Sequence, residues 1–464
     1  MGCFPSTRTK TFVQIADRLC TYNRAGKIPV KVRNKLGAVI GSQNITFQAT
    51  DPILITSKEI TLGSDKVLIS SCVLPGLDPR GEYKKKCQDN CFYLYDESGI
   101  LCCLFDGHGN QGELVAEFCQ TIIEKLFYHE HALLSSNPDK FIRMATDRCD
   151  KELSQNTQDI DPEYSGCTGV LIYLTPSVIH CGSVGDSRGM IATTVKPEVL
   201  PAPPANLGAE REILAGVKQK RKSFVETQIF SIQLTQDQKP EDPEELQRIV
   251  NCGGRVQRLT DNLGNKIGPY RVWKQNANVP GLAMSRSIGD MIAKNIGVIS
   301  EPVCTTYHRS PGDLFIVIGS DGIWDAMDNE DVGTFVECYR DKCKSNMSNH
   351  CVGVDICPSN SCIAQIVSEE ARLRWYTIVE EEDVMIDDIS CIVIEIRKNI
   401  GGGIKHSKRP VPMEEVSQEV PEGEGEGLRR APTIKEITVR DPRRGSFVSD
   451  KIEGIDFLGE GEKK

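Results

Sequence analysis

The most regular signal in this sequence is a series of short apolar runs, rich in β-branched residues and bounded by glycine, proline or acidic positions. Runs of this length and composition predict strands. Between them, apolar residues recur every three to four positions, which predicts amphipathic helices packed on sheets. The predicted strands are Phe92–Tyr95, Ile100–Phe105, Gly169–Leu174, Val178–Cys181, Leu314–Ile318 and Ile389–Ile396.

Two helices carry clear signals of their own. The apolar residues of Leu114–Phe127 recur with a 3.6-residue period and form one face. A second helix is expected to begin after Asp242 as N-cap, with Pro243 at the first helical position, and to end at a pair of glycines. Glu245 stands where a capping-box acid would return to the backbone of the N-cap residue.

The same patterns divide the chain into parts. Residues 65–398 carry the strand and helix signals and predict one folded domain. Residues 1–60 form an N-terminal extension with scattered bases, and residues 196–230 predict a surface insertion that is first rich in proline and alanine and then basic. Residues 399–464 have too few apolar residues to fold alone, which predicts a disordered regulatory tail.

Length and composition are compatible with a large enzyme core. A chain of 464 residues with 39% hydrophobic content can bury a core of roughly 250–300 residues. The formal charge of −10 comes from 65 acids and 55 bases spread along the chain, so we expect no nucleic-acid partner. No run of ~18 apolar residues occurs, so no membrane span is expected.

The 19 cysteines mostly stand singly or as strand neighbours, and no signal segment opens the chain. We therefore expect a reducing compartment and thiols that pack as small core residues. A zinc loop at residues 343–362 stays an alternative, although it has neither a C-x-x-C pair nor a matching histidine spacing.

Acidic residues follow the apolar runs at several points. The strands before Asp106 and Asp321 each run into an Asp-Gly dipeptide, which predicts a corner at the rim of a buried sheet. Asp89, Asp186 and Asp387 also border strands or glycine turns. Each position alone is explained by an ordinary turn. Together they predict a site for two hard divalent cations about 3.5–4 Å apart, because short aspartate side chains on fixed backbone provide suitable oxygen ligands.

His108 lies two residues after Asp106 and adds a candidate proton donor to the predicted metal site. An isolated histidine is more often structural than catalytic. Beside a metal site, however, it is placed to donate a proton to a leaving alkoxide.

Seven motifs occur in a fixed order in the folded domain. They are Phe105-Asp-Gly-His-Gly, Ser165-Gly-Cys-Thr-Gly, Val184-Gly-Asp-Ser-Arg, Leu234-Thr-Gln-Asp-Gln-Lys-Pro, Gly281-Leu-Ala-Met-Ser-Arg-Ser-Ile-Gly-Asp, Gly319-Ser-Asp-Gly-Ile-Trp-Asp and Asp387-Asp-Ile-Ser. This series resembles that of the metal-dependent protein serine/threonine phosphatases of type 2C. Chance assembly of seven motifs in this order is not credible.

The resemblance implies an α+β fold of four layers, a β-sandwich of two antiparallel sheets flanked by helices. It also implies a hydrolase for phosphoserine and phosphothreonine in phosphoprotein substrates. Two Mg²⁺ or Mn²⁺ ions would activate a water that attacks phosphorus in line, without a phosphoenzyme intermediate. A weaker third ion is part of the same expectation.

The resemblance also assigns roles by motif position. Asp106 would bridge both ions, the Gly107 carbonyl would bind one ion, and Asp321 and Asp387 would bind the other. Asp89 would hold metal-bound water, and Asp186 would belong to the weaker third metal site. His108 falls on the proposed general acid. The full set implied to contact metal, directly or through bound water, is Asp89, Asp106, Gly107, Asp186, Asp321 and Asp387.

Four positions depart from the common family pattern. Gln88 replaces a glutamate, Asn110 replaces a glycine, and Asp388 replaces an asparagine. The phosphate-binding arginine is matched by Lys84, a point charge without a bidentate fork, with Arg80 as a substitute. A catalytically weak, phosphoprotein-binding scaffold of the same fold is therefore the alternative function, although the retained direct ligands favour catalysis.

The N-terminus fits the myristoylation pattern, with Gly2 as acceptor and Ser6 at the favoured position. One myristoyl chain binds membranes only marginally. Palmitate on Cys3, or the bases Arg8 and Lys10, would be needed for stable anchoring. We therefore expect the protein at the cytoplasmic face of a membrane and in the cytoplasm.

Three hydroxyl residues follow basic residues and suit a basophilic kinase: Ser223 in the insertion, and Thr433 and Ser446 in the tail. Phosphate there would place roughly two negative charges beside arginines or lysines. We predict that a basophilic kinase phosphorylates Ser446 in vitro. If a Ser446→Ala protein is labelled as strongly as the intact protein, Ser446 is not the site.

Overall fold

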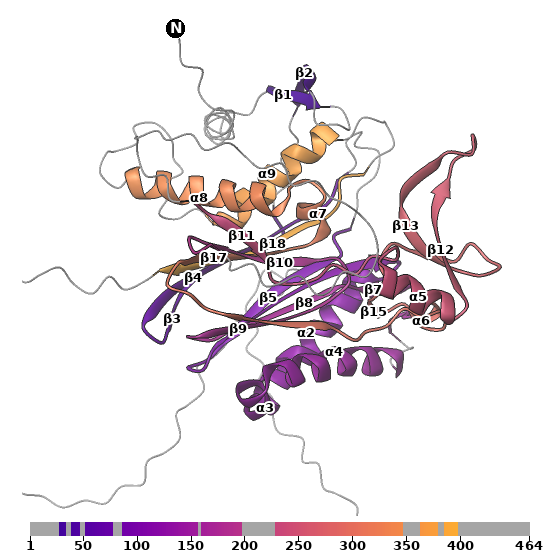
Figure 1. The fold of residues 1–464 in the computed structure, drawn as a ribbon, viewed down its shortest axis with the longest axis horizontal. Helices are drawn as coiled ribbons and strands as arrows, with labels where there is room; N and C mark the ends of the chain where they lie inside the picture. Colours follow the sequence, from indigo (N-terminus) through magenta and orange to yellow (C-terminus); the bar gives the residue numbers. More distant parts are fainter. Residues whose placement is uncertain are drawn as a thin grey trace, which may run out of the picture. The chain divides into compact units, whose positions relative to one another are not determined.

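The computed structural model describes residues 27–33, 39–46, 52–77, 86–155, 159–196, 228–346, 362–378 and 385–397. Two antiparallel sheets form its centre (Figure 1). The six-stranded sheet has the order β11 (Phe230–Gln233), β10 (Arg188–Thr193), β17 (Asp313–Gly319), β18 (Ile389–Arg397), β4 (Asp65–Leu74), β3 (Leu54–Leu62). The seven-stranded sheet has the order β15 (Ile288–Gly289), β7 (Ser165–Cys167), β6 (Ile100–Gly109), β8 (Gly169–Leu174), β9 (Val178–Val184), β16 (Val303–His308), and β5 (Asp89–Tyr95) also pairs with β6.

Alternation along each strand fills the interior of the sandwich. On β18, Ile392 and Ile394 belong to the core between the sheets, whereas Cys391 and Val393 belong to the core beneath the helices. Successive side chains point to opposite faces of a strand. Because both faces are buried, Cys391–Ile394 is an unbroken apolar run.

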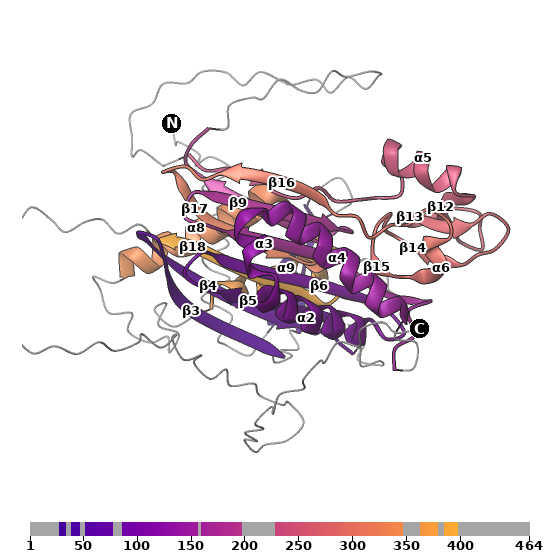
Figure 2. The same ribbon diagram turned by 90° about the horizontal axis from the view of Figure 1, so that it is seen from below.

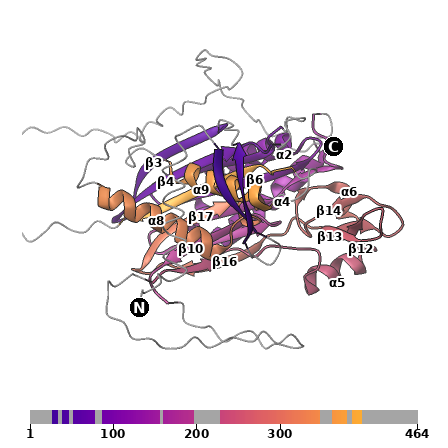
Figure 3. The ribbon, with the colours of Figure 1, turned by 90° about the horizontal axis from the view of Figure 1, so that it is seen from above.

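Helices cover the outer face of each sheet, which confirms the predicted α+β sandwich of four layers (Figures 2 and 3). The predicted helix at Leu114–Phe127 is part of α2. No helix within the described ranges is long and apolar enough to span a bilayer. One side carries α2 (Gly112–His129), α3 (His131–Ser136) and α4 (Pro138–Gln155), and the other carries α7 (Asp321–Trp324), α8 (Asn329–Asn346) and α9 (Ile363–Ile378).

A small unit of its own follows β11 in the chain and lies beyond one end of the sheets (Figures 1 and 2). Its core is formed by residues such as Ile249, Val272 and Leu282. It contains α5 (Pro243–Asn251), the three-stranded sheet β12 (Gly254–Thr260), β13 (Lys266–Lys274) and β14 (Pro280–Leu282), and α6 (Met291–Lys294). A separate hairpin is formed by β1 (Lys27–Arg33) and β2 (Val39–Thr46).

Two expectations about strands need correction. The sheet begins at Leu54, because β3 pairs with β4 over its full length, and so it starts before the predicted boundary at residue 65. Asp106-Gly107 is also not a corner. β6 continues through it to Gly109, since the strand exchanges its partner β8 for β7 at this point. Strand β7 provides hydrogen-bond partners for backbone groups that would otherwise pair with each other in a turn.

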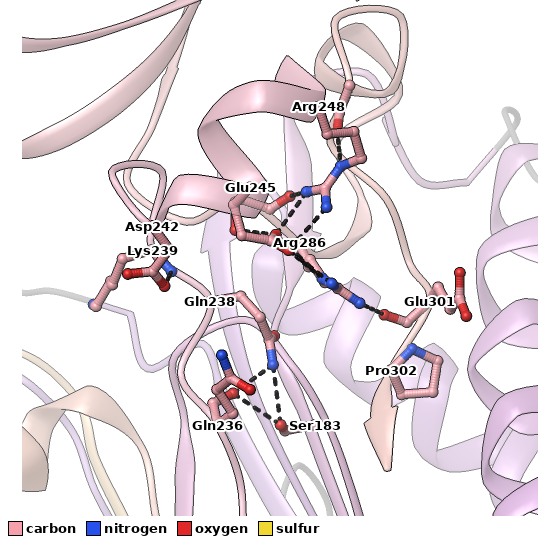
Figure 4. A network of polar contacts seen from close by, with 12 residues as sticks. Ser183, Gln236, Gln238, Lys239, Asp242, Glu245, Arg248, Arg286, Glu301 and Pro302 are labelled. Carbon is pink, nitrogen blue, oxygen red and sulfur yellow. Dashed lines mark hydrogen bonds and ion pairs between the residues drawn. The ribbon is translucent and has the colours of Figure 1, made fainter. Parts of the chain in front are cut away.

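Glu245 is not a capping-box acid, although α5 begins and ends where the sequence predicts. Its carboxylate accepts hydrogen bonds from Arg248 Nη2 at 2.6 Å and Arg286 Nη2 at 2.7 Å (Figure 4). It also accepts one from Ser285 Oγ at 2.5 Å. Arg286 in turn donates to the Glu301 carbonyl at 2.7 Å. The two guanidinium groups therefore outweigh the local capping-box signal, and Glu245 joins α5 to the segment between β14 and β15.

We expect Glu245→Gln to destabilise the protein in a pH-dependent way. Burial raises the pKa of Glu245, but hydrogen bonds from Arg248, Arg286 and Ser285 outweigh it and lower the pKa from 4.5 to about 2. The stabilisation is therefore fully present above pH 4.5 and is lost as the pH falls toward 2. Urea unfolding should show a difference of about 3 kcal/mol between wild type and variant at pH 7. A difference that does not shrink below pH 4.5 would contradict this account.

Candidate metal and catalytic site

The ends of strands from both sheets bring acidic side chains together. Asp89 opens β5 and lies directly opposite Asp106 of β6. Asp321 follows β17 as the first residue of α7, and Asp387 precedes the neighbouring strand β18. The structure thus places four of the sequence-predicted metal residues on paired strands or next to them.

These carboxylates influence each other strongly. Burial raises the pKa of Asp106 well above 3.8, and the charges of Asp89, Asp321 and Asp387 raise it further. Burial likewise raises the pKa of Asp321, followed by the charges of Asp387 and Asp186. Like charges held this closely cost free energy unless a cation offsets them.

The donor set also fits a hard cation. Oδ1 of Asp321 and Oδ1 of Asp186 are shielded from solvent and accept no hydrogen bond within the described ranges. Carboxylate oxygens of this kind are the ligands that Mg²⁺ and Mn²⁺ prefer. No three His, Cys, Asp or Glu side chains in that part of the chain, however, lie close enough to hold an ion as they stand.

Gly107 lies where three backbone segments meet. A Cβ added to it would lie 2.4 Å from the Gly112 carbonyl oxygen and 2.5 Å from that of Gln88. Only glycine therefore lets β6, the start of β5 and the start of α2 approach this closely. The approach brings the Gly107 backbone, expected to supply a carbonyl ligand, beside the acids.

His108 has a partner that the sequence reasoning missed. Its Nε2 donates to Asp290 Oδ2 at 2.7 Å, and its Nδ1 is shielded from solvent without a hydrogen bond in the described part of the chain. Burial lowers the pKa of His108, but the charge and hydrogen bond of Asp290 outweigh it, so the pKa is raised above 6.5. The imidazole is therefore favoured in its protonated form.

Local backbone geometry makes this pair possible. Asp290 has φ of 53°, a left-handed conformation that is strained for most residues with a side chain but more tolerable for aspartate. A Cβ at Gly166 would lie 2.3 Å from Asp290 Oδ2. The glycine in the Ser165-Gly-Cys motif therefore leaves room for the carboxylate that orients His108.

Asp186 also has an unpredicted partner. Lys239 Nζ forms an ion pair with Asp186 Oδ2, and Asp186 is only 3% exposed. Burial lowers the pKa of Lys239, but the charge of Asp186 outweighs it and raises the pKa. Lys239 belongs to the Leu234–Pro240 motif, so this motif could have pointed to the residue that pairs with Asp186. An ammonium thus lies beside the residue expected to hold a third ion.

Several predicted residues lie outside the described part of the chain, and their assignments stay predictions. The same holds for most of the insertion at 196–230 and for the tail at 399–464. Of the proposed zinc loop, Cys362 is a buried thiol whose Sγ lies 3.5 Å from the Ser71 carbonyl oxygen. The residues outside are Gly2, Cys3, Arg80, Lys84, Ser223, Thr433 and Ser446, with Cys351 and Cys357 of the zinc loop.

Comparison with known proteins agrees with this geometry. A family model described as Protein phosphatase 2C matches residues 76–201 and 204–357. The chain is 32% identical over 254 residues to probable protein phosphatase 2C 48 of Oryza sativa subsp. japonica, with 51% of this chain and 64% of that protein covered. It is 31% identical over 292 residues to probable protein phosphatase 2C 73 of Arabidopsis thaliana, with 57% and 69% covered.

The chain thus spans about two thirds of the length of these two relatives. The solved serine-threonine phosphatase 2C from Toxoplasma gondii aligns with 74% of this chain and 100% of its own, with a TM-score of 0.52 and 15% identity, which shows a shared fold. Because the family model covers more than half of the sequence and includes both Asp-Gly motifs, the chain belongs to the protein phosphatase 2C family of serine/threonine phosphatases.

Proposed function

We propose that this protein hydrolyses phosphoserine and phosphothreonine esters in phosphoproteins at the acidic cluster. The observation that carries the proposal is the pair Asp106 and Asp321, whose pKa values are raised by burial and by surrounding carboxylates, beside His108, whose pKa is raised by Asp290. Perturbed acids of this kind gather at functional sites.

Mg²⁺ or Mn²⁺, on which the family depends, would lower the pKa of an attacking water and offset charge on the transferring phosphoryl group. Asp106, Asp321 and Asp387 would hold two ions, with the Gly107 carbonyl as a further ligand. Asp186 would serve a weaker third ion, in competition with the Lys239 ammonium. Asp89 would hold water bound to the ions.

His108 supplies the proton that the departing alkoxide needs. Asp290 fixes the ring through Nε2, so Nδ1 is the nitrogen left to face the leaving group. Such a positioned acid contributes about 10²- to 10⁴-fold to a rate. Lys84 is proposed to bind the phosphate as a point charge.

Hydrolysis of a phosphothreonine peptide at millimolar Mn²⁺, with and without chelator, tests the proposal. We expect release of phosphate with Mn²⁺ and none with chelator. Binding of the phosphopeptide without hydrolysis would instead select the scaffold function, which the neutral Gln88 and the Lys84 point charge suggest.

We further propose that the protein is peripheral to a membrane through myristate on Gly2, with palmitate on Cys3 as the second anchor. The support is the sequence pattern at positions 2–6. Cells fed labelled myristate should incorporate it into the wild type and not into Gly2→Ala. Absence of label in the wild type would end this proposal.

A further inference from the structure

Gln88 is fixed from two sides at the point where β5 enters the cluster. Its backbone N–H donates to Asp388 Oδ2 at 3.0 Å, and its carbonyl oxygen accepts a hydrogen bond from Gly107 N at 3.2 Å. The other oxygen of Asp388 accepts a hydrogen bond from Gly76 N at 2.5 Å, and Asp388 is only 2% exposed. Because Asp89 follows Gln88 directly, these bonds set the position of the first acid.

The side chain of Gln88 joins the same point to the start of α2. Its Nε2 donates to the Gly109 carbonyl at 2.8 Å and to Glu113 Oε2 at 3.2 Å. Glu113 Oε1 also accepts a hydrogen bond from Lys86 Nζ. Both amide protons are therefore used, and an ionised carboxylate at position 88 would have none to donate.

Two of the departures from the family pattern thus touch each other. Position 88 is neutral where a glutamate is common, and position 388 is acidic where an asparagine is common. The Asp388 carboxylate accepts hydrogen bonds from the backbone N–H groups of Gly76 and Gln88. An asparagine at position 388 would point its own NH₂ donor toward one of these two donors. Asp388 therefore holds the main chain at residue 88, while the Gln88 amide holds the start of α2 through Gly109 and Glu113.

We propose that Gln88 is a positioning residue that holds Asp89 opposite Asp106 by donating hydrogen bonds, with Glu113 as its side-chain partner. This inference rests on the proposed phosphatase function. It assigns Gln88 a role different from that of an acid in the outer shell of the ions. Residues that orient direct ligands typically change metal affinity or activity by about 10- to 100-fold when replaced.

A cycle of variants tests the proposal: Gln88→Glu, Glu113→Gln and the double exchange, with Gln88→Met as the variant that removes the donors without adding charge. For each folded protein we would measure Mn²⁺ affinity by calorimetry and phosphothreonine peptide kinetics. We expect both Gln88 single variants to weaken Mn²⁺ binding and kcat about 10- to 100-fold. The double exchange should recover at least part of the loss, because the amide introduced at position 113 would donate to the carboxylate introduced at position 88.

Two outcomes overturn the proposal. If Gln88→Glu binds Mn²⁺ as tightly as the wild type or more tightly, position 88 acts as an acid in the outer shell of the ions. Additive effects in the double exchange would show that the two side chains are not partners. If the wild type has no Mn²⁺-dependent hydrolysis, the proposed function fails. The unfolding temperatures of the same four variants in chelator still test the Gln88–Glu113 pairing. The pairing predicts a lower unfolding temperature for each single variant and a partly restored one for the double variant.

Discussion

Asp321→Asn is expected to lose phosphatase activity by about a thousandfold, or about 4 kcal/mol, while becoming more stable than the wild type in chelator. The activity falls because a ligand charge is lost. The stability rises because burial and the charges of Asp387 and Asp186 disfavour the ionised carboxyl, and the amide has the same shape without that charge. The stabilisation should be about 1–2 kcal/mol, or a few degrees in Tm.

Thermal unfolding with chelator and with Mn²⁺ separates the two effects. The wild type should gain stability when Mn²⁺ is added, because a ligand that binds the folded state stabilises it. The variant should gain much less stability, so the wild type should be the more stable of the two proteins in Mn²⁺ and the less stable in chelator. Asp147→Asn on α4 is the matched control, since that side chain is 55% exposed and pairs with Lys151 on the same helix. If Asp321→Asn is less stable in chelator, the electrostatic account of the cluster is wrong.

Asp290→Asn is expected to slow hydrolysis of phosphothreonine peptides by about 10- to 100-fold but to leave para-nitrophenyl phosphate nearly unaffected. The charge of Asp290 and its 2.7 Å hydrogen bond raise the pKa of His108 and so favour the protonated ring. A threonine alkoxide needs that proton to leave, whereas nitrophenolate does not. Asparagine tolerates the left-handed backbone at position 290, so the fold should persist.

Comparison of kcat for the two substrates is the measurement. His108→Gln should show the same selectivity with a larger loss on the peptide. An equal loss on both substrates would mean that Asp290 acts on the ions or on the fold, and the assignment of His108 as proton donor would then need revision.

Strands and helices were predictable where burial alone decides them. Gly169–Leu174 is observed as β8 with the predicted bounds, because a run of buried apolar residues favours one structure. The acids of the cluster could be predicted because each lies in or beside such a strand: Asp106 lies within β6, Asp321 follows β17, Asp89 opens β5 and Asp387 precedes β18.

Long-range partners were not predictable from the sequence. Asp290 and His108 are 182 positions apart, and neither periodicity nor composition selects one acid among many as the partner. Local rules also failed where tertiary contacts were stronger. Glu245 matched a capping box but binds two arginines. Asp106-Gly107 matched a turn, but Asp106 pairs with β5 and Gly107 pairs with β7.

The uninterrupted course of β6 has a consequence for how the chemistry is aligned. Asp106 and His108 are two residues apart on one strand, so their side chains leave the same face, with Cα atoms about 6.6–6.8 Å apart. The spacing between Asp106 and His108, the proposed ion bridge and proton donor, is thus set by the strand and depends on no loop. Loops around this strand can therefore differ in length without changing the distance between these two side chains.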